Sequence, residues 1–133
     1  MREIYNHSVI VDEPIKIEVT DKPGAGGANH RYEITGFDTA ENPSVEGPDG
    51  YRHSFSKQVI LFQNGPVLEA EVNGITQETL LAIVADRLAS FQSGPFACEE
   101  NGLALSHVYK ALFHLHSRTA DRIKRKVEGQ NKE

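Results

Sequence analysis

The chain has 133 residues, of which 38% are hydrophobic and 25% are charged, and its formal net charge is −5. This length and composition predict one globular domain with a modest core. No apolar run approaches the roughly 20 residues of a membrane-spanning helix, so no membrane segment is expected. The single cysteine, Cys98, excludes an internal disulfide framework and fits a reducing cytoplasm. The acidic balance argues against binding duplex nucleic acid, which depends on many Lys and Arg contacts to phosphate.

The first half of the sequence predicts antiparallel strands. Apolar and polar residues alternate over 15–19 and again over 31–37, as in half-buried strands. The segment DKPGAGGAN between them predicts a loop. Residues 58–62 and 67–72 flank Asn64-Gly65, a pair that favours a tight hairpin, so we expect two further strands there. Residues 38–50 are rich in Pro, Gly and acids and predict an exposed loop.

The second half predicts two helices. Thr76 can cap a helix from Gln77 to about Phe91, and a linker of about four residues follows it. A long helix is expected from Gly94 to Lys126, with Pro95 in its first turn and Gly129 ending it. So short a linker makes the two helices antiparallel.

These elements predict an α+β fold in a single domain that spans residues 1–133. A small antiparallel sheet occupies about residues 1–75, and an antiparallel helical hairpin with one long helix occupies 76–129. A heptad seam runs along the long helix, which is roughly 50 Å long at the standard rise. A small domain cannot bury such a seam on itself, so the pattern predicts a partner helix. The seam residues are Cys98, Asn101, Leu105, Val108, Leu112, Leu115, Thr119 and Arg122.

Marks of catalysis and of metal binding are missing from the sequence. There is no G-x-S-x-G elbow, and His107, His114 and His116 lack the H-E-x-x-H arrangement. A lone Cys98 removes thiolate zinc patterns and reads as a small packed seam residue. The segment Gly24–Ala28 lacks the ending of a P-loop, so it is either a plain glycine loop or a place of close approach by a ligand or subunit. We therefore expect a binding protein with no catalytic residues, no metal and no cofactor.

Four residues could form a ligand site. Phe91 lies at the hairpin bend, where an aromatic ring either joins the core or stacks on a base, and Asn101 lies in the seam. Arg118 and Arg122 are one helical turn apart and present two guanidinium groups suited to phosphate. The basic cluster from Arg118 to Lys126 is otherwise a solvated helix end, favoured by the helix dipole.

The distance along the helix decides how these residues could meet. About 17 helical positions separate Asn101 from Arg118, which is roughly 25 Å, so one chain cannot wrap both around a small ligand. An antiparallel dimer sets the bend of one chain beside the basic end of the other and creates two equal sites. An aromatic face, an amide matched to adenine and two arginines fit a nucleotide-like signalling molecule.

Residues 87–105 (RLASFQSGPFACEENGLAL) and 115–129 (LHSRTADRIKRKVEG) resemble a helical hairpin shared by two phage families. These are the Thoeris anti-defence sponges and the anti-CBASS cyclic-nucleotide sponges. The preceding sheet, with DKPGAGGANHRYEI, is similar to the Thoeris type. Lys126 departs from the pattern, since a glycine is expected before Val127-Glu128-Gly129.

The resemblance implies a non-enzymatic phage protein in the host cell cytoplasm that blocks Thoeris immunity. It would hold cyclic ADP-ribose isomers made by a TIR-domain sensor, such as glycocyclic ADP-ribose, without cleaving them. Phe91 would stack on adenine, Asn101 would hydrogen-bond it, and Arg118 and Arg122 would hold the phosphates. Thr119 completes the candidate ligand-binding set. A homodimer through the long helix is implied, with hexamers in some members.

Two alternatives stay open at this stage. The first is a sponge for CBASS cyclic di- or trinucleotides, which would bind alone or at a second site. The second is a structural oligomerisation module, in which the seam serves only assembly and the basic cluster is solvated.

Overall fold

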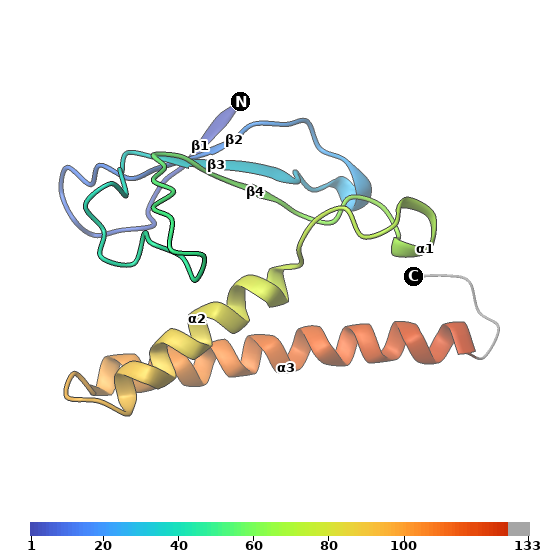
Figure 1. The fold of residues 1–133 in the computed structure, drawn as a ribbon. Helices are drawn as coiled ribbons and strands as arrows, with labels where there is room; N and C mark the ends of the chain where they lie inside the picture. Colours follow the sequence, from blue (N-terminus) through green and yellow to red (C-terminus); the bar gives the residue numbers. More distant parts are fainter. Residues whose placement is uncertain (128–133) are drawn as a thin grey trace. The chain divides into compact units, whose positions relative to one another are not determined.

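The computed structural model describes residues 1–127 and divides into two compact units between Ile75 and Thr76. The first unit holds the sheet and the second holds the helical hairpin, which confirms the predicted α+β class (Figure 1). The single-domain organisation stays a prediction. The elements are β1 (Arg2–Ile4), β2 (Lys16–Val19), η1 (Ala25–Gly27), β3 (Arg31–Thr35), β4 (Gln58–Leu61), α1 (Val67–Ala70), α2 (Gln77–Gln92) and α3 (Glu99–Val127).

The sheet is antiparallel throughout, with its strands in the order β1-β2-β3-β4. Val19 pairs with Tyr32, and Tyr32 pairs with Ile60, so these three side chains share one face. Val19 is only 1% exposed and lies at the centre of this core. The ring of Tyr32 packs edge-on against Phe62, with the ring centroids 5.6 Å apart.

Three glutamates form a row on the opposite face of the sheet. Glu3 pairs with Glu18, and Glu18 pairs with Glu33 on the next strand. Like charges directly opposite each other are unfavourable, so the row needs cations. Lys16 lies 3.9 Å from Glu3, while Arg31 pairs with Glu33 and Lys57 lies 3.4 Å from it. The hydrogen bond from Arg31 lowers the pKa of Glu33.

The predicted hairpin at Asn64-Gly65 is wrong. Residues 67–70 form the short helix α1, and the antiparallel partner of β4 is β3. Pro66 lacks a backbone N–H for a strand ladder, and its carbonyl accepts from Glu69 and Ala70 in a helical turn. The chain then returns through Ile75, which forms a parallel bridge with Phe62.

The glycine loop between β2 and β3 is held tightly against its surroundings. Gly24 donates to the carbonyl of Ala28, and a Cβ on Gly24 would lie 3.1 Å from Asn64 and 3.3 Å from His30. Only glycine fits this close approach without displacing those side chains. His30 is buried beneath the loop.

The helical unit begins as predicted and differs at the bend. The Thr76 hydroxyl accepts from the N–H of Thr79 at 3.2 Å and caps α2. The long helix α3 begins at Glu99 rather than Gly94, so Pro95 lies in the connecting loop. The reason is that the N–H of Gly94 still bonds back to the carbonyl of Phe91 and closes the end of α2. Gly129 lies outside the described residues.

The two helices pack side by side in an antiparallel hairpin (Figure 1). With 16 residues α2 is about 24 Å long, and with 29 residues α3 is about 43 Å long. The prediction that the seam cannot be buried within its own chain is therefore wrong for its middle, because α2 half-buries Leu105, Val108, Leu112 and Leu115. The last turns of α3 extend past the length of α2.

Candidate functional site

One end of the hairpin holds Phe91. It lies in the last turn of α2, and its ring is 40% exposed. The guanidinium carbon of Arg87 lies 5.6 Å from the centroid of that ring. A half-exposed ring at a helix end can accept a flat partner at little cost in folding, because it does not belong to the core.

Two hydrogen bonds fix Asn101 at the same end as Phe91. The side-chain oxygen of Gln92 accepts from the N–H of Cys98 at 3.0 Å. The Cys98 sulfur in turn accepts from the N–H of Asn101 at 3.5 Å, so Cys98 is an exposed cap of α3 rather than a packed seam residue. The second bond uses only the backbone N–H of Asn101, and its side-chain amide makes no hydrogen bond within residues 1–127.

The other end of α3 is basic. Arg118 and Thr119 are exposed and Arg122 is half-buried, with the two arginines one turn apart on the same face. Arg125 lies 3.7 Å from Asp121 and forms an ion pair with its carboxylate. The structure therefore brings Phe91 together with Asn101, and Arg118 together with Arg122 and Thr119. It does not bring the two groups together, because α3 is one continuous helix between them.

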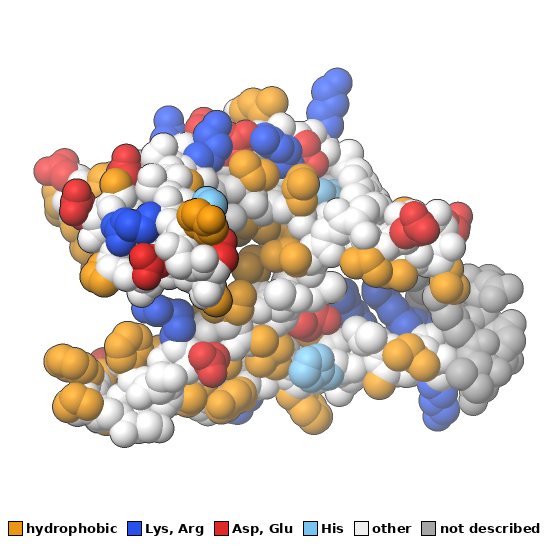
Figure 2. Space-filling view, in the orientation of Figure 1, with side chains coloured by type: hydrophobic (Ala, Val, Ile, Leu, Met, Phe, Trp, Pro, Cys, Tyr) orange, Lys and Arg blue, Asp and Glu red, His pale blue; other side chains and the backbone are white. Residues whose placement is uncertain are grey.

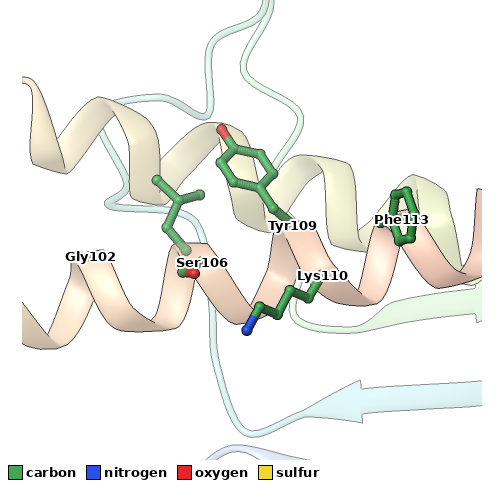
Figure 3. Close-up of a pocket in the computed structure, with 6 residues that line it drawn as sticks. Gly102, Ser106, Tyr109, Lys110 and Phe113 are labelled. Carbon is green, nitrogen blue, oxygen red and sulfur yellow. The ribbon is translucent and has the colours of Figure 1, made fainter.

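Two aromatic side chains that the sequence did not single out, Tyr109 and Phe113, lie on another side of α3. A shallow groove of about 440 Å³ runs along it, lined by Gly102, Leu105, Ser106, Tyr109, Lys110 and Phe113 (Figure 3). Tyr109 is 52% exposed and Phe113 is 65% exposed. In the space-filling view, hydrophobic side chains are spread over the surface of α2 and α3 (Figure 2). Only the spacing of positions 102, 106, 109 and 113 could have signalled this face, and its polar members obscure that signal.

Residues 1–127 contain neither a candidate metal-binding cluster nor a candidate membrane-spanning helix. No cluster of three His, Cys, Asp or Glu residues in this range could hold a metal ion. No helix in the same range is both long enough and apolar enough to cross a membrane. What the hairpin offers is an aromatic face, an amide and a pair of guanidinium groups, which can bind and orient a ligand.

Comparison with known proteins identifies this hairpin. Residues 56–120 match the family model described as Acb2/Tad1, hairpin domain. Over 68 residues the chain is 47% identical to Thoeris anti-defense 1 of Bacillus phage SBSphiJ7. That alignment covers 51% of this chain and 48% of the relative, so the chain spans about half the length of the curated relative it matches.

Residues 56–120 are therefore similar to the Acb2/Tad1 hairpin domain. Together with the likeness to Thoeris anti-defense 1, this match confirms the resemblance to the Thoeris anti-defence sponges seen in the sequence.

Proposed function

We propose that this chain is a phage anti-defence sponge that captures a cyclic ADP-ribose isomer, such as glycocyclic ADP-ribose, and holds it intact. Capture in the host cell cytoplasm would keep the signal from its effector and block Thoeris immunity. The name of the relative, Thoeris anti-defense 1, supports the biological role. The separation of two ligand-binding groups along one continuous helix carries the structural part of the proposal.

The site forms between two chains. In an antiparallel pair of α3 helices, the bend of one chain lies beside Arg118 and Arg122 of the other. The point midway between Asn101 and the arginine pair falls near Lys110. The groove of Tyr109 and Phe113 lies on the opposite side of α3 from the arginines, because nine positions, or two and a half helical turns, separate Tyr109 from Arg118. Pairing through the side of α3 that carries the arginines would create two equal sites, since a two-fold interface uses the same surface twice.

Each residue has a distinct role in such a site. Phe91 stacks on the adenine ring, and the amide of Asn101 donates to and accepts from the edge of the base. Arg118 and Arg122 hold the pyrophosphate through charge-assisted hydrogen bonds, and Thr119 follows Arg118 directly on the same helix. None of these roles needs a nucleophile, a metal or a cofactor, so the bound signal is not consumed.

A capture-and-release assay tests the proposal. The protein is incubated with the purified cyclic signal, washed by filtration and then heated to release what it holds. Intact signal in the released fraction supports sequestration. A linear or hydrolysed product would make the protein an enzyme and refute the proposal.

A second candidate ligand is a CBASS cyclic di- or trinucleotide, at this site or at another one. The family model that matches residues 56–120 supports this alternative, because it joins Acb2 with Tad1. A thermal-shift panel of cyclic ADP-ribose isomers and cyclic oligonucleotides separates the two ligand classes. A structural oligomerisation module, the remaining alternative, predicts no shift with any nucleotide. Light scattering of the purified chain distinguishes a dimer from a hexamer.

A further inference from the structure

We propose that Arg87 is a positioning residue that closes one face of the Phe91 ring and thereby directs the base to the other face. The proposal rests on the function proposed above. It starts from the guanidinium of Arg87, which lies 5.6 Å from the ring centroid. Arg87 and Phe91 are four residues apart on α2 and therefore neighbours on its surface.

The surroundings of Arg87 leave the ring as its natural partner. The positions three and four residues away on α2 are Ile83, Val84, Ser90 and Phe91, so no acidic side chain is spaced for an ion pair within the helix. Arg87 also interrupts an exposed stripe that is otherwise apolar, with Val84 before it and Phe91 after it. A cation in such a stripe is best accommodated over an aromatic face.

This contact has two consequences for stacking. First, an aromatic ring has two faces, and a guanidinium on one of them leaves a single face for a base and restricts the rotamers of Phe91. Less rotamer freedom is then lost when a ligand binds. Second, the cation attracts π-electron density toward itself, which makes the open face less negative and a better surface for an electron-rich purine. Arg87 thus acts on the ligand through Phe91 without touching it.

A double-mutant cycle tests this role. Arg87→Met keeps length and helix propensity but removes the charge, and we expect it to weaken capture of the cyclic signal roughly 3- to 30-fold. Arg87→Lys keeps the cation and should recover part of that loss. In a Phe91→Leu background, Arg87→Met should cause no further loss, because no ring remains to be positioned. An equal loss in both backgrounds would mean a direct ligand contact and overturn the proposal, as would no loss in either.

A ligand-free measurement separates this proposal from the function on which it rests. The chain contains no tryptophan, so Phe91→Trp supplies a single tryptophan, which can be excited selectively over the four tyrosines, at the ring position. Adding Arg87→Met should uncover one ring face and raise the rate of acrylamide quenching, while the melting temperature stays unchanged. Unchanged quenching overturns the ring contact even if the protein captures its signal. Failure of the unmodified protein to capture any nucleotide refutes both proposals, whatever the quenching shows.

Discussion

The Phe91→Ala substitution tests the stacking role directly. Each proposed site contains one Phe91 ring, and Arg87 covers one of its faces, so a single base can stack on it. Stacking of a base on an aromatic side chain is worth about 1–3 kcal/mol, which corresponds to a roughly 5- to 140-fold weaker Kd on its loss. The ring is already 40% exposed, so its removal opens no core cavity and should leave folding nearly unchanged.

Isothermal titration calorimetry with the purified cyclic signal measures this change, and circular dichroism verifies the fold. Phe96→Ala is the matched control, since Phe96 lies in the same bend and is 74% exposed but has no assigned role. We expect the control to bind within twofold of the unmodified protein. Equal affinities for Phe91→Ala and the unmodified protein would refute the stacking assignment, and a general loss of helicity would mean that Phe91 supports the fold.

Three further predictions concern the fold and the assembly. Gly36→Ala should lower the free energy of unfolding by at least ~2 kcal/mol in urea titrations, since its φ is +89° and its Cβ would lie 1.8 Å from the carbonyl oxygen of Pro14. Gly26→Ala, with a similar φ but open space around its Cβ, should cost less. The pKa of Glu33 is lowered in the folded chain, so its ionised carboxylate stabilises the fold above about pH 4.3, and this contribution is lost as the pH falls through the lowered pKa. Glu33→Gln should therefore make the melting temperature decline less steeply below about pH 5. Phe113 faces away from Arg122 on α3, so Phe113→Asp should leave the proposed dimer and the capture of the signal unchanged, and loss of both in light scattering and capture assays would place the interface at the groove.

The helices were the most predictable part of the fold. Thr76 predicts the start of α2, because its hydroxyl can accept a hydrogen bond from a backbone N–H of the first helical turn. The structure contains this bond, which the N–H of Thr79 donates. The sequence predicts the start of α3 five residues too early, because Pro95 is as favourable in a first helical turn as in a loop. The choice is made by hydrogen bonds of Gly94 and Cys98 to the end of α2, which are contacts between residues several positions apart.

Strands were harder to predict because their partners are distant in sequence. The three residues of β1 carry little pattern, and they become a strand only by pairing with β2. The Asn64-Gly65 pair pointed to a hairpin, but Pro66 and the side-chain hydrogen bonds between Asn64 and Asn73 favour a compact turn. The sequence therefore predicts the turn correctly, but the turn leads into helix α1 and not into a strand that pairs with β4.

The residues of the candidate site could be picked out from the sequence, whereas their arrangement needed the structure. A one-dimensional pattern gives the distance from Asn101 to Arg118 along a helix, since the helical rise is constant. It does not say which helix covers the seam, and α2 of the same chain covers its middle. Tyr109 and Phe113 went unnoticed because Ser106 and Lys110 share their face. Their exposure becomes visible only once α2 is in place.

Mixing two weakened variants tests the central claim that each site is shared between chains. At a signal concentration that saturates only intact sites, Phe91→Ala and the double variant Arg118→Ala with Arg122→Ala should each capture little signal alone. Random pairing of the two makes half of the dimers mixed, and each mixed dimer has one intact site, so capture should return to about a quarter of the normal stoichiometry. Mixing Phe91→Ala with Asn101→Ala should restore nothing, because both lesions lie in the same half of the site. No recovery in the first mixture would contradict a site built from two chains.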